Sequence, residues 1–135
     1  MKVIVDTAVW SLALRRNRPV ANEYVEQLED LIVDGRVALL GAVRQEVLSG
    51  LRHAEQFERL KVSLRAFSNL ELTVQDYELA SEYFNLCRRN GVQGANTDFL
   101  ICAAAVRRNH EILTTDKDFE SFATLLPIHL LRPAV

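Results

Sequence analysis

Long hydrophobic runs are absent from this chain of 135 residues, and cysteine is scarce. No stretch approaches the roughly 18 apolar residues of a membrane-spanning helix, so we expect no membrane association and a cytoplasmic protein. The two cysteines, Cys87 and Cys102, form no CxxC motif or other metal-ligand spacing, and we predict buried thiols in a reducing compartment. A chain of this length buries enough apolar surface to fold without disulfides or a structural metal.

Neither sign of charge is in large excess, because 16 lysines and arginines face 18 acids, for a net charge of −2. This balance excludes a whole-molecule attraction to nucleic acid, so any binding of phosphate groups must be local. Arginines do cluster, at Arg15, Arg16 and Arg18, at Arg88 and Arg89, and at Arg107 and Arg108. Each cluster is also typical of solvated helix ends, where cations are favoured near the C-terminal dipole.

Short β-branched runs alternate with helical patterns, with no linker, repeat or low-complexity segment, and we expect one domain over residues 1–135. Strands are predicted at 2–6, 37–40, 70–72, 111–115 and 128–131. Helices are predicted at 7–15, from Pro19 to Gly35, at 43–51 and at 53–67. A further helix is predicted to begin at the capping box that Thr73 and Asp76 form. Another is predicted at 99–108, with Asn96 or Thr97 as its N-cap, and a short last helix starts at 116–119. This alternation predicts an α/β protein with three α/β/α layers and a mainly parallel central sheet of about five strands.

Acidic residues fall where the predicted strands end, which is where ligands bind in open α/β sheets. Asp6 directly follows a buried-strand pattern, and because a buried carboxylate needs a partner or a metal, we predict a functional role for it. Asp116 follows the strand at 111–115 and would meet Asp6 if the two strands are neighbours. Asp98 lies in the first turn of an apolar helix, where an acid also stabilises the helix dipole by about 0.3–1 kcal/mol, so position alone leaves its role open.

Carboxylates gathered without matching cations repel one another, and some of their pKa values rise. A divalent cation resolves this repulsion, and hard oxygen ligands favour Mg²⁺ or Mn²⁺ over zinc or copper. The three histidines, His53, His110 and His129, form no zinc-like pattern. The acids therefore predict a Mg²⁺ site, with Mn²⁺ as a substitute.

Four segments together resemble the PIN-domain nucleases, and most nearly the VapC toxins of VapBC toxin–antitoxin pairs. The segments are VDTAVW (5–10), RQEVLSG (44–50), NTDFLICAAA (96–105) and TTDKDF (114–119). Their order, spacing and predicted strand or helix context match over essentially the whole chain, although family members often have serine where this chain has Ala8.

The resemblance implies a catalytic quartet of Asp6, Glu46, Asp98 and Asp116, with the three aspartates as metal ligands. Glu46 rests almost wholly on the resemblance, because its segment otherwise reads as ordinary helix surface. Asp118 is an alternative to Asp116, and we favour Asp116 because it is nearer the strand end.

Further residues are predicted to support the site. Thr7, Thr115 and Asp118 would hydrogen-bond ligands or water around the metal. Arg15, Arg16 and Arg18 are the candidates for binding the RNA backbone.

The resemblance further implies an Mg²⁺-dependent endoribonuclease that hydrolyses RNA phosphodiester bonds through an activated water and leaves 5′-phosphate and 3′-hydroxyl ends. Its expected role is that of the toxin of a type II toxin–antitoxin pair. The expected partners are RNA, with transfer RNA and a ribosomal RNA loop both open, a VapB-type antitoxin, and a second copy in a homodimer.

Other classes of protein also place an acid after the first strand. A receiver-type phosphoacceptor domain is disfavoured because Val5, not a second acid, precedes Asp6, and because Thr73 follows the middle strand. A DxD phosphatase is disfavoured because Ala8 stands where the second aspartate would be. A PIN-fold nuclease that processes RNA without being a toxin, or a non-catalytic PIN-fold binding module, remains the more serious alternative, and the presence of all four acids disfavours the inert version.

Overall fold

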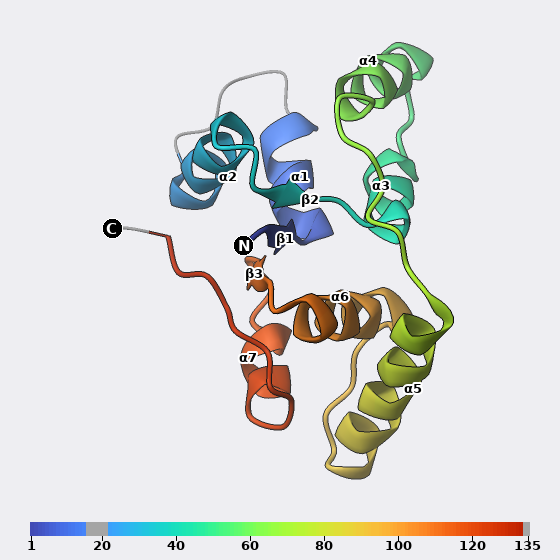
Figure 1. Cartoon of the computed structure of the whole chain (residues 1–135). Helices are drawn as coiled ribbons and strands as arrows, with labels where there is room; N and C mark the ends of the chain where they lie inside the picture. Colours follow the sequence, from blue (N-terminus) through green and yellow to red (C-terminus); the bar gives the residue numbers. More distant parts are fainter. Residues whose placement is uncertain (16–21, 134–135) are drawn as a thin grey trace.

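Three short strands form a parallel sheet at the centre of the molecule (Figure 1). The computed structural model describes residues 1–15 and 22–133. β1 (Val3–Val5) lies between β2 (Val37–Ala38) and β3 (Glu111–Leu113), and both pairings are parallel. All three residues of β1 are buried, as expected for a central parallel strand with helices over both faces.

Seven helices surround this sheet in the described part of the chain. They are α1 (Thr7–Leu14), α2 (Glu23–Val33), α3 (Gly41–Leu48), α4 (Ala54–Leu64), α5 (Val74–Arg89), α6 (Asn96–Arg108) and α7 (Asp118–Ala123). The connection from β1 to β2 and the connection that reaches β3 cross the sheet in opposite directions. Because such crossovers are right-handed, α1 and α2 belong to one face and α6 to the other, which confirms the predicted α/β class.

Two predicted strands are reduced to single bridges, so the sheet of the described residues has three strands rather than about five. Next to residues 70–72, only Asn69 forms a bridge, to Leu39. Within residues 128–131, only Leu130 forms a bridge, to Ile112. In the first case the carbonyl of Glu71 accepts a hydrogen bond of 2.9 Å from Arg108 instead of from a strand. In the second, flanking prolines lack the N–H groups that would extend the ladder.

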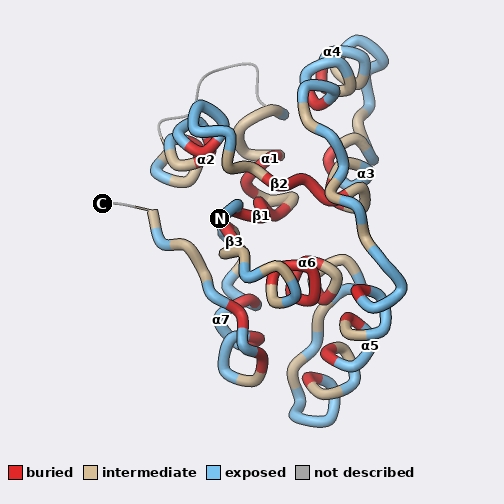
Figure 2. The backbone as a smooth tube through the Cα atoms, in the orientation of Figure 1, coloured by how far each residue is buried: buried red, intermediate tan, exposed pale blue. Residues whose placement is uncertain are grey.

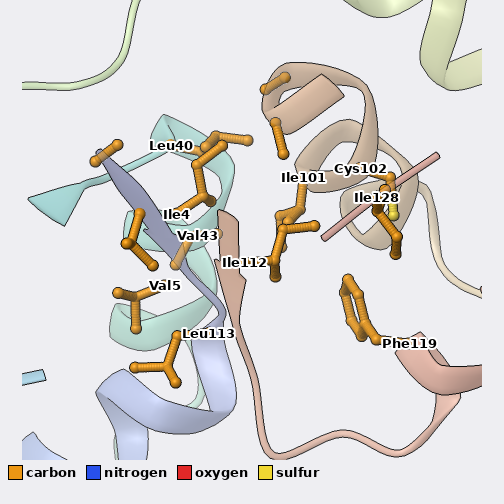
Figure 3. Packing of buried hydrophobic residues seen from close by; sticks show 14 of the residues in the cluster. Ile4, Val5, Leu40, Val43, Ile101, Cys102, Ile112, Leu113, Phe119 and Ile128 are labelled. Atoms are coloured by element: carbon orange, nitrogen blue, oxygen red, sulfur yellow. The ribbon is translucent and has the colours of Figure 1, made fainter. Parts of the chain in front are cut away.

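The core lies between the sheet and its covering helices, where the buried faces of α1, α5 and α6 point inward (Figure 2). Ile4 and Ile112 are paired in register and pack beside Ile101 of α6 (Figure 3). Cys87 and Cys102 are buried free thiols, as predicted. Among the described residues, no helix is long and apolar enough to cross a membrane.

Helix starts differ from the sequence prediction in one informative place. α6 begins at Asn96, so Asn96 and Thr97 lie inside the helix and neither is its N-cap. The side chain of Asp98 instead accepts a hydrogen bond of 2.9 Å from the backbone N–H of Ala95. The predicted start of α2 at Pro19 lies outside the described residues, and the described helix begins at Glu23 after the N-cap Asn22.

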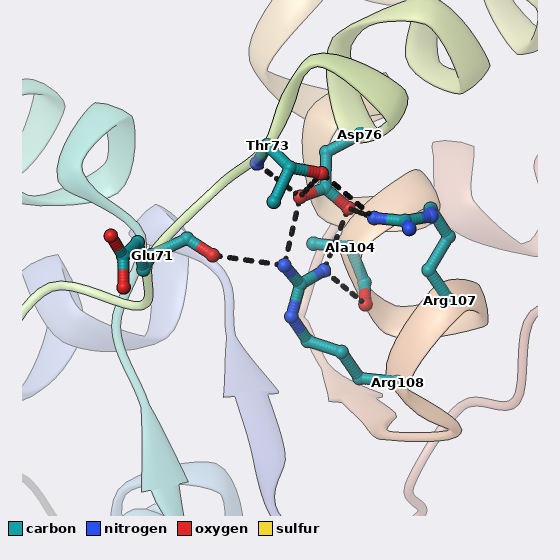
Figure 4. A network of polar contacts seen from close by, with 6 residues as sticks. All are labelled: Glu71, Thr73, Asp76, Ala104, Arg107 and Arg108. Atoms are coloured by element: carbon teal, nitrogen blue, oxygen red, sulfur yellow. Dashed lines mark hydrogen bonds and ion pairs between the residues drawn. The ribbon is translucent and has the colours of Figure 1, made fainter.

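A buried ion-pair network fixes the start of α5 against the end of α6 (Figure 4). Asp76 is fully buried, and its two oxygens accept hydrogen bonds of 2.7 and 2.8 Å from Arg108, with a further bond of 2.8 Å from Arg107. The backbone N–H of Thr73 donates to Asp76 at 2.7 Å, which confirms the predicted capping box. The hydrogen bond from Arg108 is the main cause that holds the pKa of Asp76 well below its usual range.

Candidate active site

Asp6 lies at the carboxyl end of β1 and caps the N-terminus of α1. Its side chain is buried, and both oxygens are held, because Oδ1 accepts from the N–H of Thr7 and Oδ2 accepts from the hydroxyl of Thr114, each at 2.7 Å. Burial raises the pKa of Asp6, and these two hydrogen bonds oppose the rise. The N–H of Thr7 and the hydroxyl of Thr114 thus fix the carboxylate of Asp6 at a buried position. Ionising a carboxylate there is costly without a nearby positive charge.

Thr114 joins Asp6 to Asp116. Its hydroxyl oxygen also accepts a hydrogen bond of 3.0 Å from the N–H of Asp116, whose Oδ1 accepts from the N–H of Asp118 at 2.9 Å. Sequence reasoning chose the adjacent Thr115, which is exposed. The pairing of β1 with β3 carries the signal that was missed, because Val5 lies opposite Leu113 and the next pair in register is Asp6 and Thr114.

Asp98 stands at the third position of α6, half-buried beside the other acids. Burial raises its pKa to about 6, although the hydrogen bond from Ala95 opposes the rise. The charges of Asp6, Asp116 and Glu46 raise the pKa further. A solvent-exposed helix-capping acid would have a lowered pKa, and burial beside other acids gives Asp98 the opposite shift.

Glu46 is exposed on α3, yet it is tied to the same cluster. Its Oε1 accepts a hydrogen bond of 2.7 Å from the hydroxyl of Thr7, the residue that follows Asp6. The charge of Glu46 raises the pKa values of both Asp6 and Asp98. Thr7 therefore links two of the predicted acids, because its N–H donates to Asp6 and its hydroxyl donates to Glu46.

The four predicted acids thus come from four separate segments of the chain, and the charges of the other three raise the pKa of Asp98. Each of these acids accepts a hydrogen bond from a different donor group. In residues 1–15 and 22–133, no group of three or more acidic, histidine or cysteine side chains is already arranged to hold a metal ion. A shared cation would have to draw the side chains together. The donor set fits a hard divalent cation, because it consists of carboxylate and hydroxyl oxygens and the charges that act on Asp98 are all negative.

Other predicted site residues lie around this cluster or beyond the described chain. Asp118 is exposed at the start of α7 and contacts Asp116 through its backbone N–H. Arg15 is exposed at the end of α1, and its carbonyl accepts a hydrogen bond of 2.9 Å from Gln56. Arg16 and Arg18 fall outside the described residues.

Fold and site together define a three-layer α/β protein with a cluster of acids at the carboxyl edge of its parallel sheet. The family model described as the PIN domain matches residues 3–125. The chain therefore belongs to the PIN-domain family, which confirms the resemblance seen in the sequence. This match, over nearly the whole chain, contradicts the receiver and phosphatase alternatives.

Known proteins are similar to the chain over almost its full length. Ribonuclease VapC51 of Mycobacterium tuberculosis is 29% identical over 137 residues, which cover 99% of this chain and 96% of the relative. Among solved structures, VapBC2 from Rickettsia felis bound to a DNA fragment from its promoter has a TM-score of 0.75 at 18% identity, with full coverage of both chains. FitAcB from Neisseria gonorrhoeae has a TM-score of 0.74 at 19% identity, covering 97% of each chain.

Proposed function

We propose that this chain is a divalent-metal-dependent endoribonuclease that hydrolyses RNA phosphodiester bonds. The observation that carries the proposal is that Asp6, Glu46, Asp98 and Asp116 gather at one edge of the sheet. There Asp116 and Glu46 raise the pKa of Asp6, and the other three acids raise the pKa of Asp98. Membership of the PIN-domain family and similarity to a ribonuclease support it. Carboxylates whose pKa values are raised by burial and by neighbouring acids form a site suited to binding a cation.

Asp6, Asp98 and Asp116 would hold the ion, which we expect to be Mg²⁺, with Mn²⁺ as a substitute. When bound, the ion supplies Lewis acidity, because it neutralises charge on the phosphate and makes water a stronger nucleophile at neutral pH. Asp6 is fixed by Thr7 and Thr114 and keeps its orientation as RNA enters.

Asp98 from α6 and Glu46 from α3 differ in how the protein holds them. Asp98 is held through Ala95, so one of its oxygens is free of protein hydrogen bonds. Glu46 is exposed and bonded only through Oε1, which suits a side chain that orients attacking water. Attack by water on the phosphorus would form a new P–O bond and break the bond to the 3′-oxygen, which takes up a proton, so the products would be a 5′-phosphate and a 3′-hydroxyl.

The biological role we propose is that of the toxin in a type II toxin–antitoxin pair. Several similar structures are described as VapBC or toxin–antitoxin assemblies, which supports an antitoxin of the VapB type as a partner for this chain. A homodimer is also proposed, and the exposed Val74 and Tyr77 on α5 provide apolar surface for it. An RNA-processing nuclease without a toxin role is the alternative, and growth arrest on expression that the antitoxin reverses would distinguish the two.

The decisive experiment compares three purified variants with wild type on total RNA, with Mg²⁺ and with chelator. Asp6→Asn and Asp116→Asn should remove cleavage, whereas Asp118→Asn, a matched change at an exposed acid two residues along, should retain it. New RNA ends sequenced by their 5′-phosphates would identify the substrate. Cleavage by Asp6→Asn that still depends on Mg²⁺ would contradict the role of the first ligand, and cleavage that survives chelation would contradict metal dependence.

A further inference from the structure

A small pocket adjoins the acidic cluster on the side of β3. It has a volume of about 120 Å³ and lies between the loop after β3, the start of α2 and residues 130–132. Thr114 and Asp116 line this pocket and also belong to the acidic cluster. The bridge between Ile112 and Leu130 holds the C-terminal segment alongside β3, where Figure 1 shows it passing from α7.

The pocket differs from the neighbouring cluster in having cations, although the acids Asp116 and Glu120 also line it. Lys117 and Arg132 are the cations that line it. Arg132 is paired with Glu120 through both carboxylate oxygens, the longer bond being 2.8 Å. Lys117 is exposed and forms no ion pair with any residue in the described part of the chain. Lys117 is therefore the cation that an incoming anion would meet first.

An aromatic side chain lies in the same pocket. Tyr24 is half-buried and packs partly against the core, and its backbone N–H donates a hydrogen bond of 2.8 Å to the N-cap Asn22. The cap at the start of α2 therefore holds the backbone of Tyr24 beside the pocket. The exposed Thr115 adds a hydroxyl to the lining. An aromatic ring, a hydroxyl and an unpaired cation are the groups that proteins use to bind exposed nucleotides of RNA.

Contact with the acidic cluster distinguishes the pocket beside Asp116 from three other pockets in the described part of the chain. The groove between α5 and α6 is larger, at about 450 Å³, and contains Tyr77 and Phe84. No lysine or arginine lines it, and none of the four acids does. It therefore lacks both the cation and the contact with the acidic cluster. Two other pockets also contain a cation and an aromatic ring, Lys2 with Phe67 and Arg88 with Phe84, but none of the four acids lines them.

We propose that the pocket lined by Tyr24, Thr115 and Lys117 binds one nucleotide of the RNA substrate, next to the phosphate that is hydrolysed. Lys117 binds the phosphate of this nucleotide, and its base packs on Tyr24. This inference rests on the proposed function, because it assigns part of the substrate of the same site. The preference of the enzyme for one base over another would then depend on this pocket, since the base packs on the ring of Tyr24 and not on the metal ligands.

Kinetics on one short RNA that the wild type cleaves test the proposal. Lys117→Ala should raise KM roughly three- to tenfold with little change in kcat, and should make the salt dependence of binding shallower by about 0.7 in log–log slope. Tyr24→Leu should raise KM roughly fivefold or more, whereas Tyr24→Phe, which keeps the ring, should stay close to wild type. Lys2→Ala is the matched control, because Lys2 is exposed and directly precedes β1, at the end of that strand away from Asp6. An unchanged KM and salt slope in Lys117→Ala would overturn the proposal.

Binding without catalysis separates this inference from the proposed function. In chelator, each of the four nucleoside 5′-monophosphates should shift the backbone NMR signals of Thr115, Lys117 and Arg132. Lys117→Ala should weaken nucleotide binding roughly three- to tenfold, the same factor by which it should raise the KM for RNA. Inorganic phosphate should bind more weakly than the nucleotides. If phosphate binds as tightly as every nucleotide, or if the shifts fall elsewhere, the inference is wrong. Nucleotide binding at this pocket without any RNA cleavage would leave the inference standing and contradict the proposed function.

Discussion

The hydroxyl of Thr114 donates a hydrogen bond of 2.7 Å to Oδ2 of Asp6, although 108 positions separate the two residues in the chain. The same oxygen accepts from the N–H of Asp116. One side chain thus sets the orientation of two acids that the proposed mechanism needs. Its neighbour Thr115 is exposed and provides a natural comparison.

Thr114→Val should therefore lower kcat/KM by roughly 10- to 100-fold, as is typical when a residue that orients a metal ligand is removed. Thr114→Ser keeps the hydroxyl and should recover most of the activity. Thr115→Val should keep kcat, because no hydrogen bond from it to the acids is found. Mg²⁺ affinity measured by titration calorimetry provides a second readout. Equal losses of kcat and of Mg²⁺ affinity in Thr114→Val and Thr115→Val would refute the positioning role.

Asp98→Asn should stabilise the protein in chelator while it abolishes cleavage. The pKa of Asp98 is raised to about 6 from an ordinary value of 3.8, so the folded state binds more protons than the unfolded state between these values. The stability of the wild type therefore falls as pH rises from about 4 to 6, and the cost persists at pH 7. Asparagine removes that charge and should raise the free energy of unfolding at pH 7 by about 1–2 kcal/mol. Its oxygen can still accept from Ala95.

Urea unfolding in chelator at pH 4 and pH 7 checks this expectation, with Asp118→Asn as the control at an exposed acid. The difference between Asp98→Asn and wild type should be small at pH 4 and larger at pH 7. The increase in melting temperature that Mg²⁺ produces in the wild type should be lost in the variant. Destabilisation of Asp98→Asn at pH 7 would show that its hydrogen bond to the helix start outweighs the charge.

Asp76→Ala should destabilise the fold by about 3–5 kcal/mol at pH 7, because it leaves Arg107 and Arg108 without their buried partner. The pKa of Asp76 is lowered in the folded state, so its stabilising contribution is present above its ordinary pKa of 3.8 and is lost as pH falls below that value. Urea unfolding at pH 7 and pH 3 should thus show a smaller difference between variant and wild type at pH 3. A difference that is equal at both pH values would contradict the ion-pair account.

Gly94→Ala should perturb the acidic site through packing. A Cβ at Gly94 would lie 2.5 Å from Cζ of Phe122, closer than real Cβ contacts allow, and Phe122 is fully buried. The loop that carries the Ala95 N–H to Asp98 must therefore shift. We expect a loss of about 1–3 kcal/mol in stability and a lower Mg²⁺ affinity. In the double variant with Phe122→Leu, which opens space for the new methyl group, part of the loss should be recovered, and strictly additive effects would argue against this contact.

Much of the fold follows from local patterns. The buried run at Val3–Val5, the capping box at Thr73 and the apolar face of α6 were all predictable, because each depends on residues a few positions apart. Residues 70–72 and 128–131 have strand-like sequences but form only single bridges. Whether such a segment extends a sheet depends on the partners its backbone finds elsewhere, such as Arg108 for the carbonyl of Glu71.

The sequence by itself determined the α/β class and singled out Asp6 and Asp116, because strand ends and residue types are local properties. The roles of Asp98 and Glu46 came from the sequence only through the resemblance to a family. Only the tertiary structure decided that Thr114 rather than Thr115 holds Asp6, that Thr7 ties Glu46 to the cluster, and that a pocket with Lys117 adjoins it. These facts depend on strand register and on segments far apart in the chain. A shift of one residue in register turns a side chain to the opposite face of the sheet, and the pattern of either strand alone does not specify it.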